Sequence, residues 1–133
     1  MFVPSDGFGG VSPERKAAEM LRTFHTFVAV RVVMAQLEGS GRGALGSYNA
    51  EYYQMLADHL QEVPMKNGDE WLESLMLKNQ LLGVRISEVR AAYAESDFEW
   101  EQLRRLALEG TKEANVALMR KTLAERTASS WEE

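Results

Sequence analysis

The stretch from Met20 to Leu37 is apolar on more than one side of the helix that its periodicity predicts. A helix that packs against a single core shows one apolar stripe and a polar back. One face here comprises Leu21, Phe24, Val28, Val32 and Ala35, and a second comprises Met20, Phe27, Val30, Met34 and Leu37. We therefore expect one face to fill the core of the subunit and the other to contact a second subunit or a ligand.

Start and stop signals place this helix from Ser12 to about Glu38. Ser12 suits the N-cap, Pro13 the first helical position and Glu14 the positive end of the helix dipole. Gly39 is expected to end the helix. The run of β-branched residues in its middle could indicate a strand, but the periodic flanks favour a helix.

Further helices follow in the remaining two thirds of the chain. A glycine-rich loop from Gly39 to Ser47 precedes a second predicted helix over residues 49–62. Asn67 and Gly68 have turn chemistry and lead into a short third helix whose start is acidic. The apolar residues of that third helix are Trp71, Leu72, Leu75 and Met76.

A helical pattern then runs from about Gln80 to Arg126, which is longer than a typical globular helix. Ser96 and Glu99 have the spacing of a capping box, so we expect a break or kink near Ser96. The sequence therefore predicts an all-α, four-helix subunit with a long fourth helix. We divide the chain into a disordered N-terminal segment (1–12), a single helical domain (13–126) and a polar C-terminal tail (127–133).

Composition narrows the classes of function. The net charge of −5 argues against a nucleic-acid or anionic membrane surface, which would be basic. Because the chain has no cysteine, it forms no disulfide and has no thiolate chemistry. The apolar run of the first helix is interrupted by Arg31 and falls short of the roughly 20 residues that a membrane span needs. The glycine-rich N-terminus lacks the basic and apolar regions of a secretory signal.

The residues offer little for catalysis. His25 and His59 lie on different predicted helices and outside any Glu-x-x-His frame, so we expect both to be structural or surface residues. Gly41, Gly43 and Gly46 match the dinucleotide fingerprint, but the run before them belongs to a helix and no second strand follows. We interpret them as a flexible connection between helices and expect no enzyme activity, metal or cofactor. A nucleotide-binding enzyme remains an alternative that strand content would support.

An apolar binding surface is the remaining candidate for function. Phe24 and Phe27 lie three residues apart, and Met20 lies one turn before Phe24. These side chains could belong to the core, or they could form a groove that receives apolar side chains of a peptide. Methionine suits such a groove because its flexible side chain repacks easily.

Four segments of the chain resemble the RbcX family of Rubisco assembly chaperones. They are Arg31–Leu37, Trp71–Leu75, the pairs Arg85-Ile86 and Val89-Arg90, and Ala114-Asn115. Their order and spacing agree with the family from about Arg15 to Arg126. The resemblance implies an arc-shaped homodimer in which the long fourth helix makes much of the contact between subunits.

The resemblance also implies a function. The two first helices would line a central apolar groove that holds the C-terminal tail of the Rubisco large subunit, an acidic peptide with aromatic residues. The chaperone would promote holoenzyme assembly without ATP or a cofactor and would leave when the small subunit arrives. A helical scaffold or subunit of a larger complex, without a peptide groove, is the alternative.

Site residues follow from the resemblance by position. Phe24 and Phe27 would be the groove aromatics, with Met20 at the edge. The polar contacts with the folded large subunit would fall on Gln36, Arg85, Asn115 and Arg120. Arg31 could have a structural role, as at a dimer interface, or contact the peptide.

The chain departs from the cyanobacterial pattern in three places. Phenylalanines replace the groove tyrosines, Glu38 only approximates an acidic residue expected soon after Gln36, and the loop from Gly39 differs in composition. These departures resemble the eukaryotic, type II form, which would place the mature protein in the chloroplast stroma.

Overall fold

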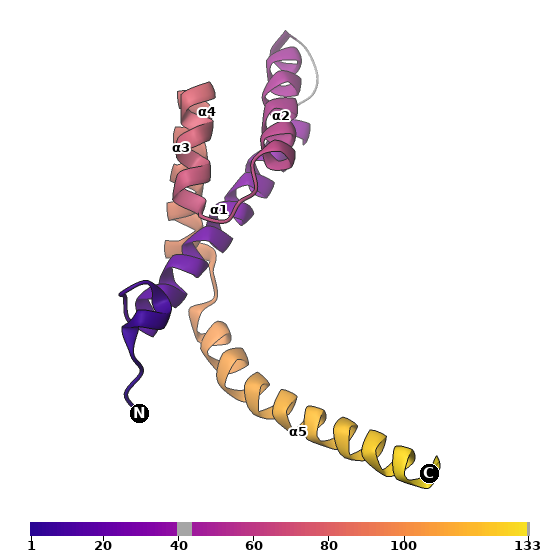
Figure 1. Ribbon diagram of the computed structural model, residues 1–133. Helices are drawn as coiled ribbons and strands as arrows, with labels where there is room; N and C mark the ends of the chain where they lie inside the picture. The colour runs from indigo at the N-terminus through magenta and orange to yellow at the C-terminus, as the bar shows by residue number, and fades with distance from the viewer. Residues whose placement is uncertain (40–43, 133) are drawn as a thin grey trace. The chain divides into compact units, whose positions relative to one another are not determined.

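The computed structural model describes residues 1–39 and 44–132, and within these ranges the regular structure is helical, without strands (Figure 1). The main helices are α1 (Pro13–Gly39), α2 (Ala44–Glu62), α3 (Gly68–Lys78), α4 (Gln80–Ala92) and α5 (Trp100–Glu132). A 3-10 turn, η1 (Ser5–Phe8), precedes α1, and a π-helical turn, η2 (Tyr93–Asp97), follows α4. The all-α prediction is confirmed.

The chain forms two compact units, which are described separately. Residues 1–97 contain η1, α1 to α4 and η2, and the residues from Phe98 onward contain α5. Within the described ranges, no helix has the length and apolar character that crossing a membrane would require.

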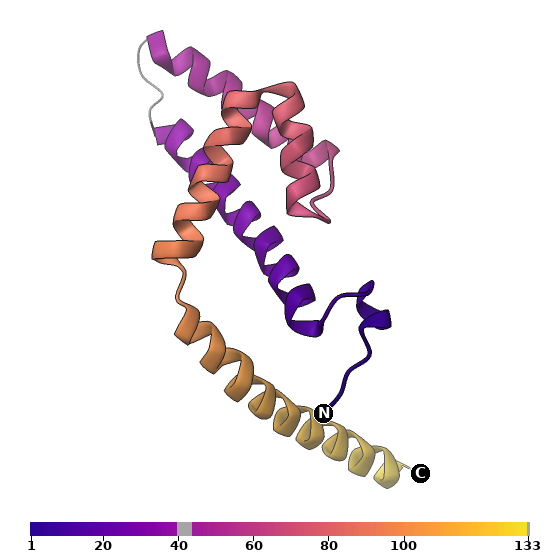
Figure 2. The ribbon, with the colours of Figure 1, turned by 90° about the vertical axis from the view of Figure 1, so that its left-hand side faces the viewer.

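The core of the first unit lies around the C-terminal half of α1. Helices α2, α3 and α4 all pack against α1, and α3 also packs against α4. The core is made of Ala29, Val30, Val33, Met34, Leu37, Leu56, Trp71, Leu72, Leu75, Leu82 and Ile86. All the α1 members of this core come after Phe24. Contacts of α1 with α3 begin at Arg22 and Thr23, and the turns of α1 that precede them project beyond the other helices of this unit (Figure 2).

The predicted start of α1 is confirmed at the level of single atoms. The Arg15 amide donates to Ser12 Oγ at 3.2 Å, and the Lys16 amide donates to the Ser12 carbonyl at 3.0 Å. Ser12 therefore satisfies amide groups that the first turn of a helix leaves without a partner, and Pro13 is the first helical residue.

Asparagines define the start of α3 and its junction with α4. Asn67 Oδ1 accepts from the amides of Asp69 and Glu70 at 2.9 and 3.2 Å, as its turn chemistry predicts. Asn79 closes α3 with its own amide, which donates to the Leu75 carbonyl at 2.8 Å, and its side chain then accepts from the Leu82 amide at 3.1 Å. One extended residue thus ends one helix and begins the next.

The expected break near Ser96 is present. Ser96 lies in η2, and α5 begins at Trp100, where the Leu103 amide donates to the Glu99 carbonyl at 3.0 Å. The predicted fourth helix is therefore two helices, and Ser96 is not the residue that starts the second one. The rings of Phe98 and Trp100 pack edge to face across the connection at 4.8 Å between centroids.

The second helix begins earlier than the sequence predicts, at Ala44 rather than near Asn49. The predicted loop from Gly39 to Ser47 is therefore shorter, and Gly46 of the possible dinucleotide motif lies within α2. Gly41 and Gly43, the other two glycines of that motif, lie outside the described residues. Intrinsic propensity is a weak guide here, because a glycine costs only about 1 kcal/mol within a helix.

Candidate functional site

An exposed apolar stripe runs along the middle of α1. It consists of Met20, Phe24 and Phe27, and we call these three residues the α1 stripe. Their exposed fractions are 65%, 50% and 40%, which are high for large apolar side chains on a helix whose other face is buried. Spacings of four and three residues place them on one side of the helix. The structure thus brings together the three predicted groove residues at the surface rather than in the core.

A positive charge continues the α1 stripe by one more turn. The Arg31 guanidinium carbon lies 5.4 Å from the centroid of the Phe27 ring, within the range of a cation–π interaction. Arg31 is exposed, so its charge is available to a partner that contacts the stripe. The stripe therefore offers aromatic surface and one cation side by side.

Ring contacts support the α1 stripe from behind. The His25 ring lies 6.2 Å from Phe24 and packs edge to face on Tyr93 of η2 at 5.5 Å. His25 and Thr26 are buried, whereas Phe24 and Phe27 on either side of them are exposed. This alternation fixes which face of α1 is turned outward.

Polar contacts anchor α1 to α3 and α4 directly beside the stripe. Asp69 accepts from Arg90 Nη1 at 2.7 Å through Oδ1 and from Arg22 Nε at 3.1 Å through Oδ2. Arg90 Nη1 also donates to Thr26 Oγ1 at 3.1 Å. We call Arg22, Thr26, Asp69 and Arg90 the Asp69 clasp. It joins three helices within one turn of Phe24.

A close backbone approach accompanies the clasp. The Gly68 amide donates to Thr23 Oγ1 at 3.0 Å. A Cβ atom at Gly68 would lie 2.7 Å from Thr26 Oγ1 and 2.9 Å from Thr23 Cα, which only glycine avoids. The turn that begins α3 is therefore held against the middle of α1.

The charge state of Asp69 follows from this arrangement. The hydrogen bond from Arg90 is the main reason that the pKa of Asp69 lies below its usual value, and Arg22 contributes in the same direction. Burial opposes the shift, because it disfavours the charged form. The carboxylate therefore stays ionised and keeps both arginines in place.

Two of the predicted polar contact residues lie together. Arg85 Nη2 donates to Gln36 Oε1 at 2.7 Å, across 49 residues of sequence. Both side chains are exposed. The contact orients the guanidinium group of Arg85 at the surface of the first unit.

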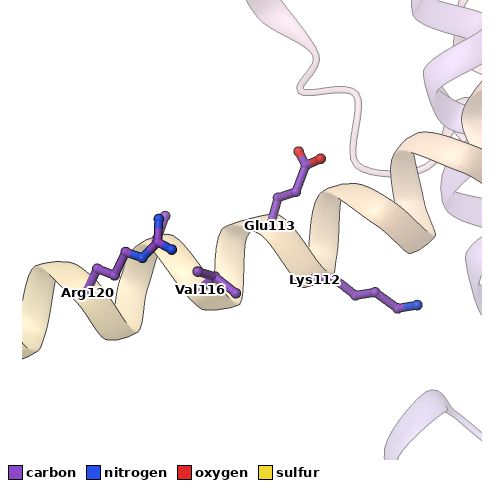
Figure 3. A pocket seen from close by; sticks show the side chains of 5 residues that line it. Lys112, Glu113, Val116 and Arg120 are labelled. Atoms are coloured by element: carbon purple, nitrogen blue, oxygen red, sulfur yellow. The ribbon is translucent and has the colours of Figure 1, made fainter.

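The other two predicted contact residues, Asn115 and Arg120, are exposed on α5. They are five residues apart, so their side chains point about 140° from each other around the helix. Arg120 borders an open depression on α5, together with Lys112, Glu113, Val116 and Ala117 (Figure 3). Glu113 and Lys112 point in different directions from the same helix, so the depression is a surface of α5 rather than an enclosed pocket.

Both histidines are buried in the first unit. Lys78 Nζ lies 3.0 Å from His59 Nδ1, and His59 Nε2 lies 2.8 Å from Ser74 Oγ. Because an ammonium group only donates, Nδ1 must accept and Nε2 carries the proton. Burial is the main reason that the pKa values of His25 and His59 are lowered, so both rings favour the neutral form. Among the described residues, no three His, Asp or Glu side chains form a group that could hold a metal ion.

The sequence identified both residues of the Gln36–Arg85 contact but not the Asp69 clasp. Gln36 and Arg85 were predicted as contact positions, although nothing in the sequence indicated that they bind each other. The roles of Arg22, Asp69 and Arg90 in one network were missed. Asp69 is expected at the start of a helix on dipole grounds alone, which hides its second role.

Comparisons with known proteins give a consistent result. A profile of the family described as RbcX protein matches residues 13–128. The chain is 43% identical over 128 residues to "Chaperonin-like RBCX protein 1, chloroplastic" from Arabidopsis thaliana, covering 94% of this chain and 68% of that one.

Solved structures agree with the sequence comparisons. RbcX-IIa from Chlamydomonas reinhardtii matches with a TM-score of 0.71 at 48% identity, covering 90% of this chain and 98% of that one. The same protein in complex with the RbcL C-terminal tail matches with a TM-score of 0.70 at 47% identity, covering 83% and 96%. RbcX1 from Arabidopsis thaliana matches with a TM-score of 0.69 at 43% identity, covering 85% and 98%. This chain belongs to the RbcX family.

Proposed function

We propose that this protein is an assembly chaperone that binds the C-terminal tail of the Rubisco large subunit along the α1 stripe. The observation that carries the proposal is the exposure of Met20, Phe24 and Phe27 on one face of a helix whose other face is buried. The structure of the Chlamydomonas reinhardtii relative in complex with the RbcL C-terminal tail supports this choice of client.

The size of the α1 stripe suits reversible binding of a peptide. Burying each phenylalanine- or methionine-sized side chain contributes about 1.5–3 kcal/mol of transfer free energy. Ordering an extended peptide offsets much of that gain, which leaves affinity in the roughly micromolar range. Arg31, beside Phe27, adds an attraction for acidic residues of the tail.

Two copies are proposed to pair through α5. From Trp100 to Ser129, the described side chains of α5 are exposed apart from Gly110, which is half-exposed. Apolar and small residues line one side of the helix, and they are Leu103, Leu106, Ala107, Gly110, Ala114, Ala117 and Leu118. A second copy would cover this side and, in an arc-shaped homodimer, place two α1 stripes along one central groove.

Polar residues are proposed to contact the folded part of the large subunit. The Gln36–Arg85 contact presents an oriented guanidinium group, and Asn115 and Arg120 of α5 complete the predicted set. Residues 13–126 form the functional domain in this proposal, with residues 1–12 and 127–133 as flanking segments.

The proposed role is that of a binding protein and not of an enzyme. Assembly is driven by binding and release, without ATP, a metal or another cofactor. The Arabidopsis thaliana relative is named as chloroplastic, which supports the chloroplast stroma as the place where this protein works.

A calorimetric titration with a synthetic peptide, the C-terminal tail of the Rubisco large subunit, tests the proposal. We expect micromolar binding that is lost when the aromatic residues of the peptide are changed to alanine. Phe24→Ala and Phe27→Ala should each weaken binding at least about tenfold, because each removes an anchor worth about 1.5 kcal/mol or more. Phe2→Ala is the matched control, since Phe2 is 90% exposed but outside the stripe.

Light scattering on the same variants separates binding from assembly. Loss of the dimer in Phe24→Ala or Phe27→Ala would place these rings in an interface between protomers and contradict the groove. Absence of binding by the unaltered protein to either peptide would favour the alternative, a helical scaffold without a client groove.

A further inference from the structure

Methionine is the only source of oxidisable sulfur in this chain, which has seven methionines and no cysteine. Their exposure differs widely. Met20 is 65% exposed and Met119 is 57% exposed, whereas Met34 in the core is 7% exposed. Access to solvent decides which thioether an oxidant reaches first, so Met20, Met119 and the fully exposed Met1 are open to it and Met34 is protected.

Met20 differs from Met119 in its neighbours. It lies four residues before Phe24 and seven before Phe27, on the side of α1 that forms the stripe. Met119 lies on α5, in the second unit. A chemical change at Met20 therefore alters the candidate peptide-binding surface directly.

We propose that Met20 is a reversible oxidation site through which hydroperoxides control binding of the client peptide, an inference that rests on the function proposed above. The Met20 sulfur attacks one peroxide oxygen, the O–O bond breaks, and an S=O bond forms while water leaves. Sulfur loses two electrons and the peroxide gains them, so the step is balanced with hydrogen peroxide as the only co-reactant.

The product changes the character of the stripe. A flexible apolar thioether becomes a polar, chiral sulfoxide whose oxygen is a strong hydrogen-bond acceptor. An apolar peptide side chain that covers this oxygen removes it from water without giving it a donor, which is unfavourable. The oxidised protein therefore binds the client more weakly, while the buried core keeps its packing.

Reversal needs only a methionine sulfoxide reductase and a dithiol reductant. The reductant forms a disulfide, the sulfoxide oxygen leaves as water, and the thioether is restored. Because the chain has no cysteine, oxidation and reduction leave no disulfide within it.

The test compares the affinity of each protein for the client peptide before and after treatment with hydrogen peroxide. Mass spectrometry of the fragment that contains Met20 measures the fraction oxidised. In the unaltered protein, we expect affinity to fall about tenfold, since the anchor loses its apolar character. Treatment with the reductase should restore the affinity.

Matched variants assign the effect to one sulfur. Met20→Leu cannot be oxidised at this position, so its affinity after treatment should equal its own value before treatment. Met119→Leu should still show the full loss. Met20→Gln, which places an amide oxygen near the position of the sulfoxide oxygen, should bind weakly without any peroxide.

The proposal is overturned if the protein with Met20 fully oxidised binds the peptide as the reduced protein does, or if Met20→Leu shows the same loss. Absence of peptide binding by the reduced protein would instead contradict the proposed function. A hydrophobic dye then decides the oxidation effect independently. Its fluorescence should fall on oxidation of the unaltered protein and stay constant in Met20→Leu.

Discussion

The two units of this chain bury apolar side chains in different ways. Residues 1–97 enclose a core in which Trp71, Leu75 and Ile86 are at most 1% exposed. In α5, by contrast, Leu106, Leu118 and Leu123 are each more than half exposed. A helix in a protein gains most of its stability from the packing of one face against other elements. The first unit can therefore stabilise itself, whereas α5 requires a partner surface.

The largest effect is expected from a change on the side of α5 that is proposed to face the second copy. Leu106→Arg places a charge among the small and apolar residues of the proposed dimer side, and we expect the dimer to dissociate. Leu108→Arg is the matched control, because Leu106 and Leu108 are 56% and 55% exposed and point about 160° apart.

Sedimentation equilibrium distinguishes the two variants by their mass. We expect a monomer for Leu106→Arg at micromolar concentrations and a dimer for Leu108→Arg. Two dimers would contradict the assignment of this side of α5 to subunit pairing. Two monomers would mean that the partner covers both sides of the helix.

The next largest effect is a loss of stability expected at Trp71, a buried tryptophan of the first unit. Trp71 is 1% exposed, and its Nε1 donates to the Val63 carbonyl at 3.1 Å. Trp71→Ala should lower the free energy of unfolding by about 3–5 kcal/mol, because it removes a large buried ring and leaves a cavity. Trp100, which is 48% exposed, supplies the control.

Denaturant titrations followed by far-ultraviolet circular dichroism measure both tryptophan variants. Trp100→Ala should cost about 1 kcal/mol or less, as expected for a surface position. Similar losses in the two variants would mean that Trp100 is buried in the assembled protein and that the contrast between the units is smaller than the single chain shows.

Local signals in the sequence were enough to predict several elements of the first unit. Ser12 and Asn67 begin helices with the caps that their side chains favour, and the interruption lies where Ser96 indicated a break. These features depend on residues within one turn of each other. The start of α2 at Ala44 was missed, since a glycine-rich composition suggested a loop there.

Tertiary packing decided what periodicity left open. The sequence assigned Met20 and Phe27 to the same face as Val30, Met34 and Leu37, yet the first two are exposed and the last three are buried. The helices that pack against α1 cover only some of its sides and first contact it at Arg22 and Thr23, and no pattern within α1 encodes this arrangement. The Asp69 clasp was missed for the same reason, because Arg90 lies 21 residues from Asp69 in sequence.

A third prediction concerns the pH dependence of stability in the first unit, which its two buried histidines should cause. Burial lowers the pKa of His25 and of His59 below 6.5, the ordinary value that they regain on unfolding. The unfolded chain therefore binds more protons, so stability is fully present above pH 6.5 and is lost as the pH falls toward the lowered values. For His59, protonation also removes the acceptor that Lys78 binds.

Unfolding titrations from about pH 8 to about pH 5 measure this dependence of the free energy of unfolding on pH. We expect the free energy of unfolding to decrease below pH 6.5, by less than the loss caused by Trp71→Ala. The decrease should be smaller in His59→Gln and smaller still when His25→Gln is added. A slope that neither variant changes would exclude the histidines as its source.

The smallest effect is expected at the Asp69 clasp, where exposure weakens an otherwise well-formed network. The Asp69 side chain is 48% exposed and the Arg22 side chain 50%, so solvent screens their attraction. Asp69→Asn keeps an acceptor for Arg90 but loses the charge, and it should lower the free energy of unfolding by about 0.5–1 kcal/mol.

The stability of the two proteins at low pH is the control for this last prediction. The lowered pKa of Asp69 means that its stabilising contribution is present above 3.8, the value in the unfolded chain, and is lost as the pH falls through the folded-state value. The unaltered protein and Asp69→Asn should therefore converge in stability at low pH and separate again on neutralisation. A difference that persists in acid would show that the asparagine disturbs the packing of α1 against α3 rather than the charge. In that case peptide affinity should fall as well, because the clasp lies within one turn of Phe24.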